Sequence, residues 1–225
     1  MTTAPAATDP IDTRDMVCVH VFLRREFRLA ASVVREVSAG DRHRSRVVAD
    51  HLEFITRFLH NHHTAEDELL WPRLRERVPD EIAPIVHLME TQHEAVDSLL
   101  QQINDLLPGW RESAATKDRD RLAALFDALY PGLAEHLDAE EQRLLPLAAR
   151  SVSLKEWHEL GKAGVAVLPR SEMPLVLGMF QYEGDPVVVA QIAREAPPLI
   201  RFIVPLLARR AFRKHALSVH GTSTP

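Results

Sequence analysis

The chain has 225 residues, of which 46% are apolar, and a formal net charge of −5. This apolar content is sufficient for a buried core and excludes a chain that is disordered throughout. The negative charge balance gives no electrostatic footprint for nucleic acid. The single cysteine excludes an internal disulfide framework and a multi-cysteine zinc site, whereas twelve histidines are many for a chain of this length. The positions of these histidines therefore bear on function.

The N-terminal segment, residues 1–12, has no feature of a targeting sequence. It is rich in Thr, Ala and Pro, and it lacks the basic and apolar stretches of a signal peptide. The apolar stretches further along the chain are too short to span a bilayer. We therefore expect residues 1–12 to be disordered and the protein to be cytoplasmic, without a membrane span.

Residues 13–150 carry apolar side chains at intervals of three and four, the pattern of amphipathic helices. Pro72 and Pro131-Gly132 are expected to kink or interrupt the second and fourth helical runs. Four long helices joined by short loops favour an all-α, up-down-up-down four-helix bundle. The expected ends of the four runs are Gly40, Pro79-Asp80, Pro108-Gly109 and about residue 150.

The C-terminal third, residues 151–225, has a different composition, in which Pro and Gly become frequent. Ser153 is a candidate N-cap for a first helix there, and the tail from Val219 is expected to fray. The expected helices cover about 151–168, 186–195 and 197–216. The sequence thus predicts a disordered N-terminus (1–12), a four-helix bundle (13–150) and a helical C-terminal extension (151–225).

Two segments of the bundle share the pattern H-x-x-A-E-[DE]-x-x-L-x-P, one starting at His62 and the other at His136. Residues four apart lie on the same face of a helix, so His62 projects beside Glu66 and His136 beside Glu140. A single pair of this kind is often only a solvated contact on a helix surface. The repetition of the pattern distinguishes these two pairs.

Chain geometry brings two further histidines to the same level of the bundle. Residues equally far from a turn lie side by side in antiparallel helices, and at about 1.5 Å per residue His20 and His93 match the repeats to within one helical turn. All four histidines have apolar neighbours, where buried imidazoles and carboxylates would be costly without a cation. We therefore predict one metal site with the ligands His20, His62, Glu66, His93, His136 and Glu140.

The number and type of ligands bear on the metal. Four imidazoles and two carboxylates are too many for one tetrahedral zinc ion. They suit two ions bridged by carboxylates, and nitrogen and oxygen ligands without thiolate favour iron or manganese. His51 is too far from this layer and is expected to be an ordinary core or surface residue. Four neighbours are candidates for contacts to the ligands from outside: His63, Asp67, Asp97 and Glu141.

The order H…HxxxE…H…HxxxE resembles the pattern of the hemerythrin-like family, the HHE cation-binding domain, over roughly residues 13–150. The extension resembles the tails of actinobacterial members of that family. The resemblance implies a four-helix bundle that holds two iron ions in a non-haem, oxo- or hydroxo-bridged di-iron centre. It also implies that Glu66 and Glu140 bridge both irons.

Two departures from the oxygen-carrying hemerythrins are visible. Met89 stands where those proteins have a second histidine one turn before the third-helix ligand, and their HxxxxD is replaced by HxxxE at His136 and Glu140. One imidazole fewer is expected to leave an iron open to water or another exogenous ligand. The departures argue against a simple reversible oxygen carrier.

The family resemblance implies a protein that binds or reacts with dioxygen, hydrogen peroxide or nitric oxide. We favour a di-iron oxidoreductase, catalase-like or handling nitric oxide or oxygen, whose partner is a small diatomic or peroxide ligand. Two alternatives stay open: a non-catalytic oxygen or iron sensor or iron-binding module, and a di-iron oxidase or oxygenase that acts on an organic molecule. The sequence does not identify the electron donor or the oligomeric state.

Overall fold

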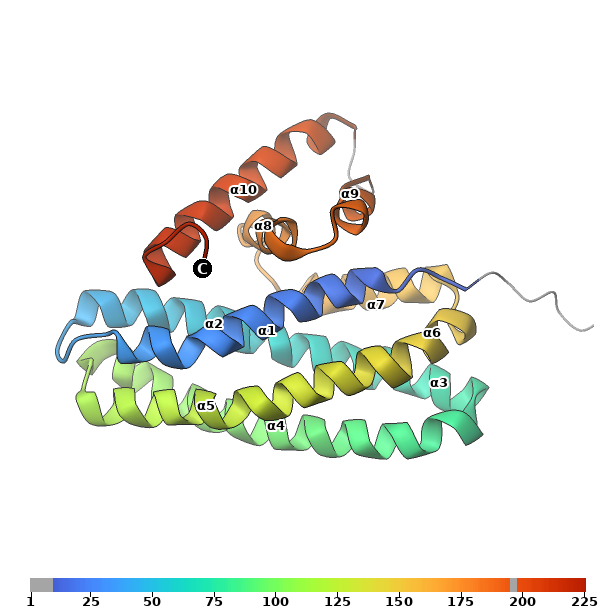
Figure 1. Cartoon of the computed structure of the whole chain (residues 1–225), viewed down its shortest axis with the longest axis horizontal. Helices are drawn as coiled ribbons and strands as arrows, with labels where there is room; N and C mark the ends of the chain where they lie inside the picture. Colours follow the sequence, from blue (N-terminus) through green and yellow to red (C-terminus); the bar gives the residue numbers. More distant parts are fainter. Residues whose placement is uncertain (1–9, 195–197) are drawn as a thin grey trace, which may run out of the picture.

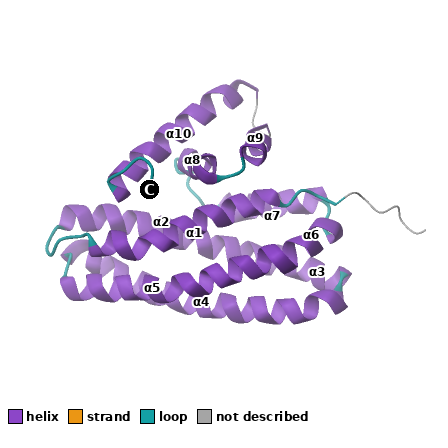
Figure 2. Cartoon of the chain, viewed as in Figure 1, coloured by secondary structure: helices purple, strands orange, loops and turns teal. Residues whose placement is uncertain are grey.

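The computed structural model describes residues 10–194 and 198–225, and this part of the chain contains helices and no strand (Figure 2). Four long helices lie side by side and alternate in direction (Figure 1). Their bounds are Arg14–Arg35 (α1), Arg42–Ala65 (α2), Pro79–Ser113 (α4) and Thr116–Ala139 (α5). The predicted all-α, up-down-up-down bundle with additional C-terminal helices is confirmed.

Short connections at one end of the bundle hold the helices antiparallel. Gly40 has a φ of 76°, a left-handed conformation that glycine adopts at little cost. Its amide donates to the carbonyl of Ala114, in the connection between α4 and α5, at 3.0 Å. The side chain of Asp41 caps α2 by accepting from the amide of Arg44 at 2.9 Å. The two loops at this end are therefore tied to each other.

Two prolines lie inside helices that were expected to end or break there. α4 continues through Pro108 and Gly109 to Ser113, and α5 continues through Pro131. A proline inside a helix costs about 3 kcal/mol, which is comparable to what one fully buried large side chain contributes. Trp110, two residues after Pro108, is fully buried in the core. Tertiary packing therefore allows α4 to continue past Pro108.

Both repeats contain a π-helical turn that begins at the glutamate. The segment η1 (Glu66–Leu70) joins α2 to α3 (Trp71–Arg77), and η2 (Glu140–Leu144) joins α5 to α6 (Leu145–Ser151). Pro72 lies in the first turn of α3, directly after the π-helical turn, so the backbone departs from a regular α-helix just before the proline. Such π-helical turns are rare and are frequent at functional sites.

Two hydrophobic clusters fill the bundle and leave a polar layer between them. The larger cluster contains Leu23 and Phe58, and the smaller one contains Met16 and Ala65. Each of the four predicted histidines stands between the two clusters, as His20 does between Met16 and Leu23. The core therefore encloses this layer from both sides along the bundle axis.

The C-terminal extension packs across one side of the bundle (Figure 1). The predicted N-cap is confirmed, because Ser153 and Glu156 form a capping box. One helix, α8, was not predicted, and its sequence, with a proline in the first turn and an internal Gly178, resembles a loop. The helices of the extension are α7 (Leu154–Ala166), α8 (Met173–Glu183), α9 (Pro186–Arg194) and α10 (Pro198–His220).

The end of α10 is well packed, and the expectation that the tail frays from Val219 was wrong. Val219 is buried in the larger hydrophobic cluster. The guanidinium of Arg44, on α2, donates to the carbonyls of Ser218 and Val219. These contacts satisfy the last carbonyls of α10, which otherwise lack helical partners. No helix among the described residues is long and apolar enough to cross a membrane.

Candidate metal centre

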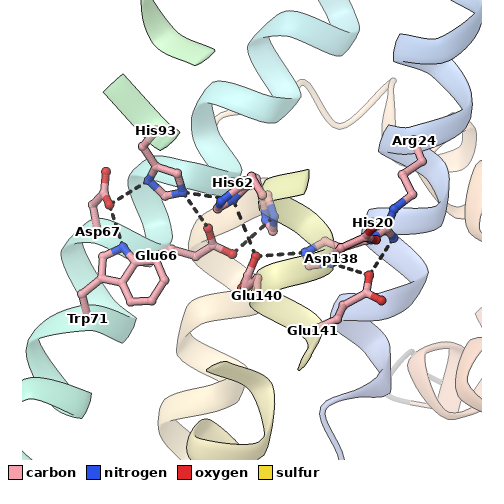
Figure 3. Close-up of polar contacts among 11 residues, drawn as sticks. His20, Arg24, His62, Glu66, Asp67, Trp71, His93, Asp138, Glu140 and Glu141 are labelled. Atoms are coloured by element: carbon pink, nitrogen blue, oxygen red, sulfur yellow. Dashed lines mark hydrogen bonds and ion pairs between the residues drawn. The ribbon is translucent and has the colours of Figure 1, made fainter. Parts of the chain in front are cut away.

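Buried imidazoles and carboxylates from both halves of the bundle meet in the polar layer (Figure 3). They come from α1, α2, η1, α4, α5 and η2, and each side chain is almost completely shielded from solvent. They fall into two groups, and within each group the ligand atoms all lie within 4.8 Å of one another. The first group is His20, His62, Glu66 and Glu140, and the second is His63, His93 and His136.

The first group pairs one imidazole with each carboxylate. Nε2 of His20 lies 3.4 Å from Oε2 of Glu140, and Nε2 of His62 lies 3.3 Å from Oε1 of Glu66. The rings of His20 and His62 meet edge to face, with centroids 5.3 Å apart. Imidazole and carboxylate from neighbouring helices therefore converge on a common point.

The second group is built from three imidazoles. Nε2 of His93 lies 3.2 Å from Nε2 of His136. The ring of His63 stacks on that of His93, with centroids 4.0 Å apart, and meets the ring of His136 edge to face at 5.0 Å. Among the described residues, this group contains no carboxylate of its own.

The two carboxylates lie between the groups. Glu66, which contacts His62 through Oε1, has its Oε2 3.8 Å from Nε2 of His93. Oε2 of Glu140, which contacts Nε2 of His20, also lies 3.8 Å from Nε2 of His136. Each carboxylate can thus serve both groups.

Most of the converging atoms make no hydrogen bond. Among the described residues, Nε2 of His20 and His62, both nitrogens of His63 and both oxygens of Glu66 and Glu140 are buried without a partner. A buried polar atom left without a partner costs about 1–3 kcal/mol, and more when it is charged. So many in one layer would be strongly destabilising, and cations would satisfy them together. The residues therefore fit a metal centre.

Two outer carboxylates fix the orientation of two of the imidazoles (Figure 3). Oδ1 of Asp67 accepts from Nδ1 of His93 at 3.0 Å and from the indole of Trp71 at 2.7 Å. Oε1 of Glu141 lies 2.8 Å from Nδ1 of His20 and accepts from Arg24 at 2.6 Å. In both cases Nε2 is left to face the layer, which is the arrangement that supports histidine as a metal ligand.

The family model for the hemerythrin HHE cation-binding domain matches residues 13–148. The chain belongs to this family. No curated protein and no solved structure matches the chain. The HHE domain covers 60% of the sequence and includes both groups of side chains. The protein is thus a metal-binding module of the hemerythrin type with buried His/Glu clusters.

Two positions in the HHE domain differ from what the sequence pattern indicated. Asp97 was one candidate for a contact with His93, but that hydrogen bond is made by Asp67, and Oδ1 of Asp97 lies 3.8 Å from Nδ1 of His60. His63 was expected outside the ligand layer, yet it is buried among potential ligands. α2 packs against both α1 and α4, so His62 faces α1 while His63 faces α4.

Burial keeps most imidazoles of the layer neutral. It lowers the pKa of His62 to about 3 and that of His136 to about 4, and it holds the pKa of His63 well below the ordinary range. Burial and the adjacent charge of Glu140 raise the pKa of Glu66 well above its usual value. Metal binding requires neutral imidazoles and ionised carboxylates. His62, His63 and His136 are therefore ready to bind, whereas Glu66 releases a proton when a cation arrives. Burial alone would lower the pKa of His20, but the contacts with Glu140 and Glu141 outweigh it and raise that pKa.

A largely apolar cavity of about 530 Å³ lies between the bundle and the C-terminal extension. Met16, Ala65 and His62 line it from the bundle, and Trp157 and Phe180 line it from α7 and α8. Since His62 belongs to the first group of candidate ligands, the cavity reaches the polar layer. This contact was invisible in the sequence, because it depends on how the extension folds back.

Proposed function

We propose that the protein is a non-haem di-iron protein that binds or reacts with a small oxidant: dioxygen, hydrogen peroxide or nitric oxide. The observation that supports it most is the set of buried, unpartnered nitrogen and oxygen atoms in two adjacent groups that share Glu66 and Glu140. Two groups with shared carboxylates suit a pair of ions better than one. Nitrogen and oxygen ligands without thiolate favour iron or manganese, and membership of the HHE family favours iron.

In this proposal each of the two groups of side chains has a defined task. His20, His62, Glu66 and Glu140 hold one ion, and His63, His93 and His136 hold the other, with both carboxylates reaching across. Iron bound there would supply redox chemistry toward small oxidants. The two hydrophobic clusters keep the layer dry, so that charge interactions inside it are strong. We further propose that residues 13–150 act as the metal-binding unit and that residues 151–225 cover its side.

The proposal is tested by metal analysis and by reaction kinetics. We expect two irons per chain, and turnover or a spectral change when the reduced protein is mixed with dioxygen, peroxide or nitric oxide in separate experiments. The Glu66→Ala/Glu140→Ala variant removes the shared carboxylates and should lose this iron. An exposed control, Glu112→Gln, should retain it. Zinc in place of iron, or full iron in the double variant, would contradict the proposal.

The cavity beside His62 favours a second candidate function, the oxidation of an apolar organic molecule at the same centre. Its volume of about 530 Å³ lies within the range of small-molecule sites. Gly164 lines the cavity, and no atom lies within 4 Å of where its Cβ would be, so Gly164→Phe can place a ring there. Loss of organic-substrate turnover in this variant, with iron content and peroxide reactivity unchanged, would support it. Unchanged turnover would exclude the cavity as the substrate site.

A further inference from the structure

A third cluster of buried titratable side chains lies outside the polar layer of the bundle. It consists of Glu26 on α1, His51 on α2 and His220 at the end of α10. Their ligand atoms all lie within 4.8 Å of one another, and the exposed fraction of each side chain is 6% or less. The cluster therefore joins the bundle to the last helix of the extension.

The three converging atoms have the spacing of metal ligands. Oε2 of Glu26 lies 3.4 Å from Nε2 of His51 and 3.3 Å from Nε2 of His220. Bonds of about 2.0–2.2 Å to one tetrahedral ion place neighbouring ligand atoms roughly 3.3–3.5 Å apart. Among the described residues none of these three atoms has a hydrogen-bond partner, although all are buried. They point toward one another without bonding to one another.

Two of the three side chains are held from behind, and the backbone just before the third is anchored. Nδ1 of His51 lies 3.0 Å from Nε2 of His215, a hydrogen bond that leaves Nε2 of His51 free. The other oxygen of Glu26, Oε1, accepts from the guanidinium of Arg25 at 2.5 and 3.0 Å. His220 follows the two carbonyls that Arg44 binds at the end of α10. The free atoms are therefore fixed in position.

The charges around the cluster leave room for a cation. Arg25 contacts Glu183 as well as Glu26, at 3.1 Å, so one guanidinium is shared by two carboxylates. Its other neighbours are the rings of Tyr182 and Phe212, each centred 5.0 Å from the guanidinium carbon. The two carboxylates thus carry one negative charge more than the guanidinium, and Glu26 is the fully buried one of the two.

The protonation states also suit a ligand set. Burial lowers the pKa of His51 to about 3, so its imidazole is neutral. Burial alone would raise the pKa of Glu26, but the contact with His220 and the charge of Arg25 outweigh it and lower the pKa to about 2. Glu26 is therefore ionised, as a metal ligand must be.

We propose that Glu26, His51 and His220 bind one divalent cation of the zinc class, separate from the centre between the hydrophobic clusters, and that this ion fastens α10 to α1 and α2. Two imidazoles and one carboxylate are a recognised ligand set for zinc, and they leave the fourth position to water. The divalent cation more than offsets the single excess negative charge, and it satisfies the three unpartnered atoms at once. Without it, the cluster is only the polar contact of His220 with Glu26.

A metal titration of the full chain separates these two states. The chain is first loaded with iron and then titrated with Co²⁺, whose ligand-field absorption reports a tetrahedral site. One additional Co²⁺ per chain is expected, displaced by Zn²⁺. His220→Gln, at the end of the last helix, should bind this ion at least tenfold more weakly, and so should Glu26→Gln. His43→Gln, an exposed histidine on α2, is the matched control and should bind as the unchanged chain does.

A variant of the bundle centre makes the test independent of the proposed di-iron site. Glu66→Ala/Glu140→Ala leaves Glu26, His51 and His220 intact and should still bind one Co²⁺ with tetrahedral absorption. Zn²⁺ should also slow tryptic cleavage at exposed basic residues of α10 such as Arg213 in the unchanged chain, but not in His220→Gln. Failure of the iron-loaded chain to bind a further ion, or equal Co²⁺ affinity in His220→Gln, would overturn the proposal and leave only the polar contact.

Discussion

The two outer carboxylates, Asp67 and Glu141, should control metal affinity although neither belongs to the two ligand groups. Replacing either one by alanine removes the acceptor that orients a histidine, His93 in one case and His20 in the other. Loss of such a contact typically weakens metal binding by about 10–100-fold. We expect this loss in both Asp67→Ala and Glu141→Ala, measured by competition with a chelator of known affinity.

The two variants should differ in stability. Asp67→Ala leaves two donors without an acceptor, the imidazole of His93 and the buried indole of Trp71. Each buried donor left without an acceptor costs about 1–3 kcal/mol, and the lower value applies here because water can enter at the partly exposed site of the carboxylate. The free energy of unfolding should therefore fall by roughly 2 kcal/mol. In Glu141→Ala, Arg24 keeps its contact with Asp138 at 2.6 Å, so the loss should be smaller.

Asp138→Ala is the matched control, since this exposed carboxylate contacts Arg24 but no histidine. An exposed ion pair contributes about 0–1 kcal/mol, so neither metal affinity nor stability should change appreciably. Chelator competition and denaturant unfolding are measured on all three variants. If Asp67→Ala and Glu141→Ala hold metal as tightly as Asp138→Ala, the outer carboxylates do not orient the ligands and the reasoning fails.

Three further predictions concern packing, pH and metal removal. Gly178→Ala would place a Cβ 2.2 Å from the carbonyl oxygen of Ala208, so α8 and α10 must separate. The free energy of unfolding should therefore fall by about 1–3 kcal/mol. Gly132→Ala, which has open space around the new Cβ, should instead stabilise α5 by roughly 0.5–1 kcal/mol. Both are measured by thermal unfolding. His62 and His136 have folded pKa values of about 3 and 4, below the ordinary 6.5, so the unfolded chain binds more protons between these values. The metal-free protein should therefore lose stability as pH falls from 6.5 toward 4, and a flat pH profile would contradict the burial of neutral imidazoles. Chelation should lower the unfolding free energy by about 2.7 kcal/mol for each ion removed, relative to protein held at a free metal concentration 100 times Kd. An unchanged midpoint would show that the ions do not favour the folded state.

Periodic features of the chain were the ones that the sequence could predict. The repeated H-x-x-A-E-[DE] pattern and the spacing of apolar residues indicated the bundle, and His20 and His93 fall at the level of the repeats, as counting from the turns implied. Prolines misled because their local cost competes with burial elsewhere, as at Pro108 beside Trp110. Helix propensity is a local quantity, whereas burial depends on the whole fold.

Features that depend on which neighbour a face meets could not be read from the sequence. His63 lies about 100° around α2 from His62 and was expected to be peripheral, but α2 has a partner on each side. His51 and His220 are 169 residues apart in the chain, and no spacing rule relates them. Their encounter required α10 to fold back onto α1 and α2, which only the three-dimensional structure reveals.

The outer contacts cross between the two repeats, and this has a consequence for how the protein matures. Asp67, in the first repeat, steadies His93 of the second half of the bundle, whereas Glu141, in the second repeat, steadies His20 of the first half. Neither half can assemble oriented ligands by itself. During synthesis the N-terminal hairpin would emerge with its histidines unsupported, so tight metal capture must wait until the last bundle helix has docked. For the proposed metal centre, the crossed contacts would thus tie tight metal binding to completion of the bundle.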